Sequence, residues 1–307
     1  MGRDVTVIIP TLDRREMLSR ALASALAQED VELEVVIVDD GSSEPVEAGE
    51  DPRVRVVRHE RPQGVARARN AGLAEARGEW VAFLDDDDTW APAKLREQLA
   101  AAQEVGAGMA FSASVVIGDD GRVAGLDPPP ATDGLLAELL RHNHIPGGCS
   151  NVIARTALVR EAGGFDDRLS MLADWDLWIR LAARTHAAAC AEPHVGYLDH
   201  ADSMHVREAR TTPGELVHLA AKHRELLATH GIRPEAGVWV VSWAAAGEHR
   251  AGHPLRAARM YARAAVRFRS KGMLLRALTA PFSDRLVRLD SNGSLLPAGA
   301  SPGWLAP

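Results

Sequence analysis

Glu-Trp-Val-Ala-Phe-Leu-Asp-Asp-Asp-Asp-Thr-Trp, residues 79–90, is a short apolar run followed by four consecutive aspartates. The segment from Trp80 to Leu84 has the length and composition of a buried strand. The aspartates Asp85 to Asp88 would then lie at the carboxyl end of that strand, where open α/β sheets bind their ligands. Carboxylate oxygens suit Mg²⁺ or Mn²⁺, and these cations in turn hold phosphate oxygens. An isolated acidic run is more often a solvated turn, so the rest of the chain decides between the two interpretations.

Buried strands and amphipathic helices alternate in the N-terminal third of the chain. Strands are predicted over 5–9, 34–38 and 54–57, and helices over 14–28, 64–77 and 91–105. This alternation predicts βαβ units, and hence an α/β fold with a mostly parallel, Rossmann-like central sheet flanked by helices. A second acidic pair, Asp39 and Asp40, follows the second strand. Because the carboxyl ends of parallel strands meet at one edge of a sheet, we expect both acidic clusters to converge on one crevice.

The pattern is looser after Gly106. A strand is predicted over 109–117, a helix over 173–184 and an extended segment over 187–197. A mainly helical section begins at Pro213, and a tail rich in Gly, Pro and Ser begins at Asp290. This predicts a helical C-terminal extension on the α/β domain.

Composition narrows the class of protein. The chain has 307 residues, of which 46% are hydrophobic, and a formal net charge of −7. We expect a cytoplasmic protein, because we find no apolar run of about 18 residues and no signal-peptide pattern at the N-terminus. Two cysteines make neither a disulfide framework nor a four-ligand zinc site. The negative net charge argues against nucleic acid as a partner.

Basic residues are concentrated near the C-terminus. Residues 250–288 hold ten Lys and Arg and one acid, a formal charge of +9 against −16 for the remainder. On the helix predicted over 255–268, a basic stripe is formed by Arg256, Arg259, Arg263 and Arg267. The stripe is compatible with peripheral contact at the inner face of a membrane, or with a pyrophosphate-linked lipid acceptor. The alternatives are a solvated helix face, or a contact to the acidic main domain or to a second subunit of a homodimer.

Several common ligand motifs do not match. No G-x-G-x-x-G follows the first strand and no Walker lysine is present, which argues against a Rossmann cofactor and a P-loop. A calcium loop counted from Asp85 has Trp90 where glycine is needed and Arg96 where glutamate is needed. What remains is a sheet edge that binds a nucleotide through acidic groups and a metal ion.

A series of short motifs, in this order along the chain, resembles family 2 inverting glycosyltransferases with the GT-A fold. The N-terminal signature is matched by VIIPT at 7–11, VDDGS at 38–42, ARNAG at 68–72 and FLDDDD at 83–88. The acceptor-side half is matched by GGFD at 163–166 followed by DWDLW at 174–178. The similarity covers roughly residues 4–205, and the shared order makes it far more specific than any one tetrapeptide.

The resemblance implies how the nucleotide is bound. Pro10, Thr11 and Asp39 would line the pocket for the nucleobase and ribose. Asp40 would support the loop that carries Asp39, and Asp86 would lie near the ribose.

The resemblance also implies a divalent cation, Mn²⁺ or Mg²⁺. Asp85-x-Asp87 matches the D-x-D motif of the family, with Asp87 as the most direct metal ligand and Asp85 beside it. His200, after the last extended segment, is a candidate for contact with phosphate or metal, and a solvated loop histidine is the alternative.

Asp174 matches the catalytic base of the family. The family usually carries a Glu-Asp pair here, whereas this chain has Ala173 before the aspartate. The implied reaction is a single displacement, in which a carboxylate removes the proton of the attacking hydroxyl.

The resemblance implies a division of the chain into segments. A GT-A glycosyltransferase domain would span 1–210, with a nucleotide-sugar-binding half over 1–106 and an acceptor-binding half over 107–210. A helical extension over 211–289 and a flexible tail over 290–307 would follow. The implied partners are a UDP-, dTDP- or GDP-linked sugar donor and a glycan, lipid-linked or small-molecule acceptor.

Two other functions share this sheet. A sugar-nucleotide pyrophosphorylase would need a Gly-rich loop after the first strand, and residues 10–14 contain no glycine. A non-catalytic module that binds a nucleotide sugar or glycan stays open because of Ala173.

Overall fold

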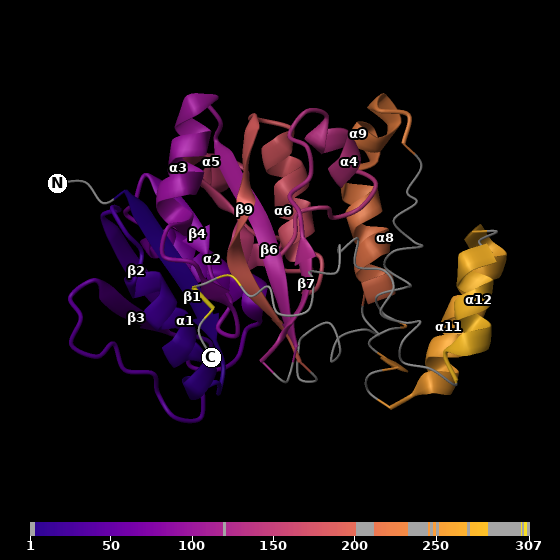
Figure 1. The fold of residues 1–307 in the computed structure, drawn as a ribbon, viewed down its shortest axis with the longest axis horizontal. Coiled ribbons are helices and arrows are strands. Elements are labelled where there is room, and N and C mark those ends of the chain that lie inside the picture. The colour runs from indigo at the N-terminus through magenta and orange to yellow at the C-terminus, as the bar shows by residue number, and fades with distance from the viewer. Residues whose placement is uncertain are drawn as a thin grey trace.

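A nine-stranded sheet with helices on both faces forms the centre of the computed structural model (Figure 1). The structure describes residues 4–118, 121–200, 212–232, 252–268 and 271–281, together with Ala245, Glu248, His249, Pro302, Trp304 and Leu305. Within this part of the chain the strand order is β3-β2-β1-β4-β8-β6-β9-β5, and β7 pairs with β6.

The first half of the sheet is parallel, as predicted. It consists of β1 (Val5–Thr11), β2 (Leu33–Asp39), β3 (Val54–Arg58) and β4 (Trp80–Phe83). The helices between or after them are α1 (Arg15–Leu26), α2 (Val65–Glu75) and α3 (Lys94–Glu104). Every residue of β1 and β2 is buried. Burial on both faces explains why these strands are mainly apolar. Their buried polar residues Thr6 and Glu34 are hydrogen-bonded to each other.

The second half of the sheet mixes strand directions. The short β8 (Ile153–Arg155) is antiparallel to both β4 and β6 (Met109–Gly118). The long β9 (Ala187–Asp199) runs parallel to β6 and antiparallel to β5 (Thr89–Trp90). A hairpin joins β6 to β7 (Val123–Asp127). The strands β5, β7 and β8 were not predicted from the sequence.

Side chains alternate between the two faces of the sheet. Ile8 packs with Leu73 of α2 on one face, whereas Val7 and Ile9 pack with Leu18 of α1 on the other. α3 covers the same face as α1. The face of α2 is also covered by α4 (Leu135–Leu139), α5 (Thr156–Glu161) and α6 (Ala173–Ala182). The predicted helix over 173–184 is therefore confirmed as α6.

The helix α8 (Thr212–Lys222) and the shorter α9 (Arg224–Thr229) pack beside α6, with Leu219 and Leu227 in the same core. Asp176 of α6 is fully buried and accepts hydrogen bonds from Lys222 Nζ at 2.9 Å and from Arg180. His223 Nε2 lies 2.9 Å from the other carboxylate oxygen. Burial opposes ionisation, but these partners lower the pKa of Asp176 to about 2. Asp176 is thus an anchor for the C-terminal helices.

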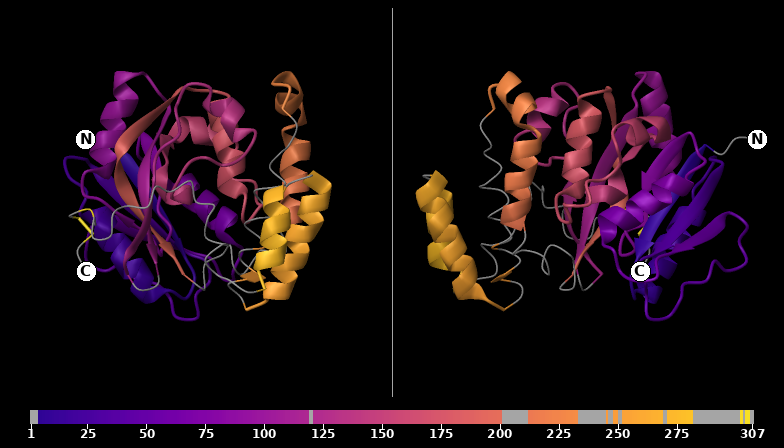
Figure 2. Two further views of the ribbon diagram at one scale, coloured as in Figure 1. Left: turned by 45° about the vertical axis from the view of Figure 1, so that its right-hand side comes forward. Right: turned by 180° about the vertical axis from the view of Figure 1, so that it is seen from behind.

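Two further helices, α11 (Pro254–Phe268) and α12 (Lys271–Thr279), lie beyond α8 on the side away from the sheet (Figures 1 and 2). They form a small core of their own around Tyr261 and Met273. None of the helices described is long and apolar enough to cross a membrane. Most of the predicted tail over 290–307 lies outside the described residues.

Candidate active site

The acidic loop 85–88 lies at the carboxyl edge of the parallel strands. The register pairs Ile8 of β1 with Phe83, the last residue of β4, and β1 continues to Thr11. Thr11 at the end of β1 donates a hydrogen bond from Oγ1 to Asp86 Oδ2 over 2.7 Å. The predicted convergence of 39–40 and 85–88 on one edge follows from β1 lying between β2 and β4.

Two arginines supply the positive charge that the four carboxylates need. Arg14, at the start of α1, places NH1 2.8 Å from Asp87 Oδ2 and 3.2 Å from Asp86 Oδ1. Arg69 of α2 is 3% exposed and forms an ion pair with Asp85. Burial lowers the pKa of Arg69, but the nearby acids raise it overall, so this guanidinium stays charged. Neither arginine was among the predicted site residues, although Arg69 belongs to one of the motifs.

The carboxylates of the acidic loop differ in charge. Burial raises the pKa of Asp86 to about 6, and the neighbouring Asp87 adds to this effect. Burial together with the charges of Asp87 and Asp85 raises the pKa of Asp88 well above its usual range. Burial also opposes the ionisation of Asp87, but the hydrogen bond with His200 and the charge of Arg14 lower its pKa overall. Of these three carboxylates, Asp87 is thus the one whose pKa is lowered by its partners.

Asp88 is a structural residue of the loop. It is 1% exposed and accepts hydrogen bonds from Ser150 Oγ and, over 3.0 Å, from the backbone N–H of Leu198. Ser150 belongs to the 3₁₀ helix η1 (Gly148–Asn151), and Leu198 belongs to β9. Asp88 thus ties the acidic loop to the second half of the sheet.

Asp39 and Asp40 organise the loops after β2 and β3. Asp39 is fully buried and accepts hydrogen bonds from the backbone N–H groups of Ser42 and Val46 and from Arg58. Asp40 accepts hydrogen bonds from the backbone N–H groups of residues 63 and 64, at 2.9 and 2.8 Å. Asp40 thus connects the end of β2 to the loop after β3, and the carboxylate of Asp39 already has several hydrogen-bond donors.

Gly41 explains the glycine of the VDDGS motif. Its φ angle is +87°, and a Cβ atom would lie 2.7 Å from the backbone carbon of Arg61. Both the left-handed backbone and this close approach require glycine. The residue lets the loops after β2 and β3 pack against each other at the edge of the site.

Asp174 lies across the site from the acidic loop, in the first turn of α6. The side chain is half-buried, and its Oδ1 accepts a hydrogen bond from the backbone N–H of Trp175. Asn143 Nδ2 is 3.5 Å from Oδ2, a long hydrogen bond. Burial raises the pKa of Asp174 to about 6, against the opposing effect of the Arg69 guanidinium. Ala173 is fully buried in the core, so its position has no space for the glutamate that the family usually carries there.

Two consecutive glycines, Gly147 and Gly148, precede η1, and the second lies beside Asp174. Both have positive φ angles, +66° and +54°, and a Cβ atom on Gly148 would lie 4.0 Å from Asp174 Oδ2. A side chain here would extend over the carboxylate. Glycine at position 148 therefore leaves space beside the carboxylate of Asp174.

Residues 6–161 match the family model described as Glycosyl transferase family 2. The chain belongs to this family. The match spans β1 to β8, the acidic loop and Arg69, and it ends before α6 and β9.

Two curated relatives of this family 2 chain are named for the biosynthesis of succinoglycan and of teichuronic acid. The succinoglycan biosynthesis protein ExoO of Rhizobium meliloti is 35% identical over 211 residues, 64% of this chain and 60% of ExoO. The putative teichuronic acid biosynthesis glycosyltransferase TuaG of Bacillus subtilis is 36% identical over 123 residues, 38% of this chain and 49% of TuaG. The chain thus spans about half to three fifths of the length of these two relatives.

Solved structures confirm that the family 2 chain has the GT-A fold. S. aureus TarS 1–349 in complex with UDP-GlcNAc superposes with a TM-score of 0.61 at 20% identity, over 92% of this chain and 82% of that one. The mannosyltransferase PcManGT of Pyrobaculum calidifontis, in complex with GDP-Man and Mn²⁺, gives a TM-score of 0.56 at 21% identity, over 93% and 88%.

The donor set of the family 2 chain fits a divalent cation that is shared with a ligand. His200, at the end of β9, is 7% exposed and has Nε2 3.0 Å from Asp87 Oδ2. Among the residues described, no three His, Cys, Asp or Glu side chains are arranged as a closed metal site. This suits Mg²⁺ and similar ions, which take one or two carboxylates and complete their shell with substrate phosphates and water. Arg14 now neutralises the anion that such a cation would bind.

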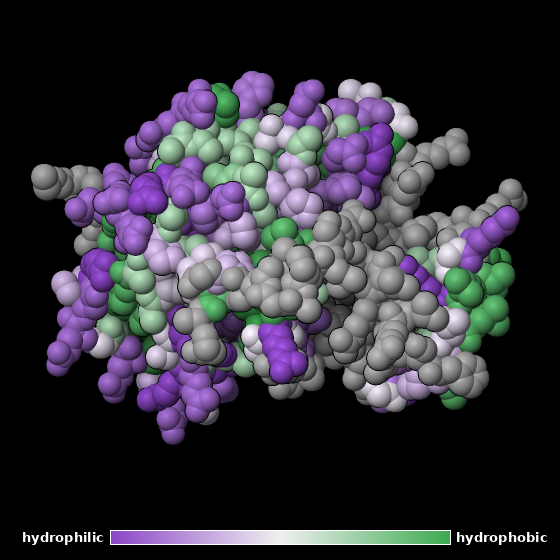
Figure 3. All heavy atoms as spheres, viewed as in Figure 1, coloured by the Kyte–Doolittle hydropathy of each residue, from purple (hydrophilic) through white to green (hydrophobic). Residues whose placement is uncertain are grey.

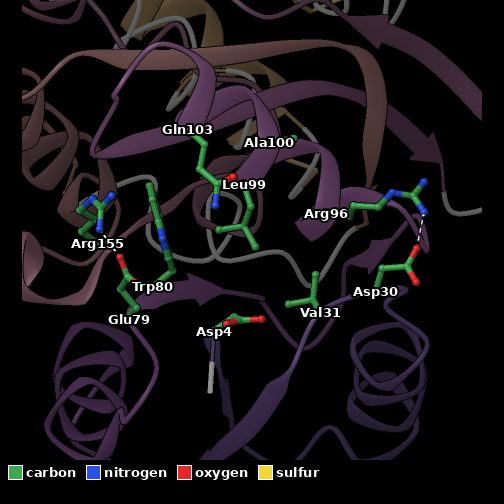
Figure 4. Close-up of a pocket in the computed structure, with 10 residues that line it drawn as sticks. All are labelled: Asp4, Asp30, Val31, Glu79, Trp80, Arg96, Leu99, Ala100, Gln103 and Arg155. Carbon is green, nitrogen blue, oxygen red and sulfur yellow. Dashed lines mark hydrogen bonds and ion pairs between the residues drawn. The ribbon is translucent and has the colours of Figure 1, made fainter. Parts of the chain in front are cut away.

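A cavity of about 340 Å³ lies at the opposite, amino-terminal edge of the strands (Figure 4). It is lined in part by Asp4, Glu79 and Trp80, which stand at the beginnings of β1 and β4. The charged side chains around it pair with each other, Arg96 with Asp30 at 3.0 Å and Arg155 with Glu79. The cavity is therefore remote from the predicted site residues, and none of them lines it.

Proposed function

We propose that this family 2 chain is a divalent-cation-dependent, inverting glycosyltransferase that moves a hexosyl group from a nucleoside-diphosphate sugar to an acceptor hydroxyl. The observation that carries the proposal is the position of Arg69 between two acidic centres. Its guanidinium pairs with Asp85 of the acidic loop, and its charge also acts on Asp174. One buried cation thus links the proposed diphosphate side of the site to the proposed base.

The donor occupies the edge formed by β1, β2 and β4 in this proposal. Pro10, Thr11 and Asp39 line the nucleobase and ribose pocket, and Asp86 lies near the ribose. Asp40 holds the adjacent loop through the N–H groups of residues 63 and 64. The structures of TarS with UDP-GlcNAc and PcManGT with GDP-Man support a nucleotide sugar as the ligand of this fold.

Asp87, His200 and Asp85 would hold the cation. When bound, it would stabilise the negative charge that develops on the leaving diphosphate. The partners of Asp87 lower its pKa and so favour the carboxylate form, which is the form that binds a cation. Mn²⁺ in the PcManGT structure supports a divalent ion in general.

Asp174 acts as the general base. Its carboxylate accepts the proton of the acceptor hydroxyl while the acceptor oxygen bonds to the anomeric carbon. The bond from that carbon to the diphosphate oxygen breaks in the same step, and the diphosphate leaves with the electron pair. Attack from the face opposite the leaving group inverts the anomeric centre. Asn143 contacts Asp174 through a long hydrogen bond. In this proposal Asn143, a neutral residue, orients the base in place of the glutamate that usually precedes it.

The proposed segments follow from these roles. Residues 1–106 carry the donor side, 107–210 carry the acceptor side, and 211–289 form the helical extension. The acceptor would be a glycan, a lipid-linked glycan or a small molecule with a free hydroxyl. The names of the relatives that make succinoglycan and teichuronic acid support a glycan.

Nucleotide binding tests the donor side directly. Thermal unfolding is measured with UDP, GDP, dTDP and CDP, each with and without Mn²⁺. We expect one nucleotide to stabilise the protein only with the cation, by about 2.7 kcal/mol at 100 times its Kd. Stabilisation by a nucleotide without turnover of the matching sugar donor would support a non-catalytic binding module. No stabilisation in any condition would contradict the proposed donor site.

The pH profile tests the base. The pKa of Asp174 is raised to about 6, and a base works only when deprotonated. At saturating cation we therefore expect kcat/KM to fall about tenfold per pH unit below 6 and to level off above about 7. The groups that set this value are Arg69, which favours the ionised form, and Asp85, which opposes it. A rate that is flat down to pH 5 would contradict the assignment of Asp174.

A further inference from the structure

The pair of helices α11 and α12 exposes apolar side chains to an extent unlike the rest of the described chain. Among the described residues eight large hydrophobic side chains are exposed, and five of them lie on these two helices: Leu255, Val266, Leu274, Leu275 and Leu278. Their exposed fractions range from 53% to 82%. Apolar residues gather over α11 and α12 at the right-hand edge of Figure 3. Such a concentration on a surface otherwise rich in polar residues indicates an interaction site.

The exposed residues form one outward face on each helix. On α11, Leu255, Arg259 and Val266 follow a helical repeat of four and seven residues and share a face. The opposite face carries Ala257 and Tyr261, both fully buried against α12 and its neighbours. On α12, Leu274, Leu275 and Leu278 lie opposite the buried Met273. The small core between the helices therefore holds each apolar face outward.

The same two helices are strongly basic. Residues 254–279 contain seven Lys and Arg and no acid. Arg256, Arg259, Arg263 and Lys271 are exposed, and they stand among the apolar residues. An amphipathic helix with basic and apolar side chains on its exposed surface binds at an anionic lipid interface. The apolar side chains are buried in the interface, and the basic side chains are attracted to the anionic lipids.

We propose that the outward faces of α11 and α12 dock on an anionic lipid bilayer, with the leucines entering the interface and the arginines contacting lipid phosphates. A membrane explains both the charge and the exposed leucines. The acidic remainder of the chain, with formal charge −16 outside 250–288, would be repelled by the same surface and would orient away from it.

A second copy of the chain fits these faces less well. An apolar face of this size needs an apolar counterpart on its partner. Outside α11 and α12, the exposed large hydrophobic side chains of the described residues are Leu12, Val105 and Val217. They lie at three separate places: Leu12 before α1, Val105 directly after α3, and Val217 on α8. The described surface of the main body therefore has the opposite charge to α11 and α12, but its exposed large hydrophobic side chains do not form a matching apolar face.

Vesicle sedimentation of the full chain tests the proposal. We expect binding to vesicles of phosphatidylcholine mixed with phosphatidylglycerol, weaker binding at high salt, and none to phosphatidylcholine alone. Arg259→Ala with Arg263→Ala should weaken partitioning about 30-fold, from about 1 kcal/mol per arginine at 1.4 kcal/mol per tenfold. Leu274→Ser, Leu275→Ser and Leu278→Ser together should weaken it at least about tenfold.

A matched control variant carries Val105→Ser and Val217→Ser, which remove exposed apolar groups elsewhere, and should bind vesicles like the unchanged protein. Equal sedimentation with neutral and anionic vesicles, or an unaltered affinity in the arginine variant, would overturn the proposal. So would a dimer in light scattering that the leucine variant abolishes while no vesicle binds. Nucleotide-dependent thermal stabilisation should be the same in all variants, so failure here and failure of the proposed donor site are told apart.

Discussion

Asp174→Asn is expected to lower the rate of sugar transfer by about 10²–10⁴-fold, the usual contribution of a general base. Asparagine has nearly the same shape and can still accept the hydrogen bond from the backbone N–H of Trp175. It has no basic lone pair for the acceptor proton. The loss should therefore appear in kcat for transfer, while the affinity for the nucleotide changes little. The rate is measured with the donor identified by thermal unfolding.

Stability separates this effect from misfolding. Burial raises the pKa of Asp174 to about 6, so the ionised carboxylate destabilises the fold at neutral pH. The stability linked to this group is fully present below its ordinary pKa and is lost as pH rises through about 6. The neutral asparagine avoids that loss, and we expect the variant to melt no lower than the parent at pH 8. A normal rate in Asp174→Asn would remove Asp174 from the mechanism, whatever the melting temperature.

Asp167→Asn is the matched control for this variant. Asp167 is also an aspartate of the proposed acceptor-side half, but its side chain is 44% exposed and pairs with Arg67 on the surface. The same chemical change here should leave both the rate and the pH profile as they are. A comparable loss in this variant would show that transfer responds to charge on this half in general and not to one base.

The parallel half of the fold was predictable because local pattern and tertiary environment agree there. β1 and β2 are mainly apolar because both of their faces are covered, and the apolar pattern of α1 matches the burial of Leu18. The strands β5 and β8 have two and three residues, which is too short for a periodic signal. They exist because of pairing with the distant β9 and with β4 and β6. Such strands depend on the assembled sheet, and a local sequence window does not contain that information.

The acidic half of the site was predictable and its basic half was not. Runs of aspartate after apolar strands identify the sheet edge, and repulsion within the run requires a nearby cation. The sequence does not say which arginine supplies it. Arg14 meets Asp86 across 72 positions of the chain, and Asn143 meets Asp174 across 31. Only the fold decides these contacts, because it brings the start of α1 and the loop after α4 to the same edge.

Asp87→Ala is expected to abolish the cation-dependent stabilisation by nucleotide, about 2.7 kcal/mol at 100 times Kd, a shift of several degrees. Asp87 is the anion of the acidic loop that both Arg14 and His200 contact, at 2.8 and 3.0 Å. Without it, the cation would keep His200 and Asp85, and the second of these already neutralises Arg69. Thermal unfolding with and without Mn²⁺, at fixed nucleotide, measures the effect.

Asp87→Asn distinguishes charge from shape in the same assay. Asparagine can still bond His200 and fill the same space, but it presents no anion to the cation. If charge is what binds the metal, this variant should lose the Mn²⁺-dependent shift as completely as Asp87→Ala, while melting closer to the parent without ligands. Asp167→Ala, at an exposed surface pair, should keep the full shift. A Mn²⁺-dependent shift that survives in both Asp87 variants would move the cation to other ligands, because Asp87 would then contribute nothing to its binding.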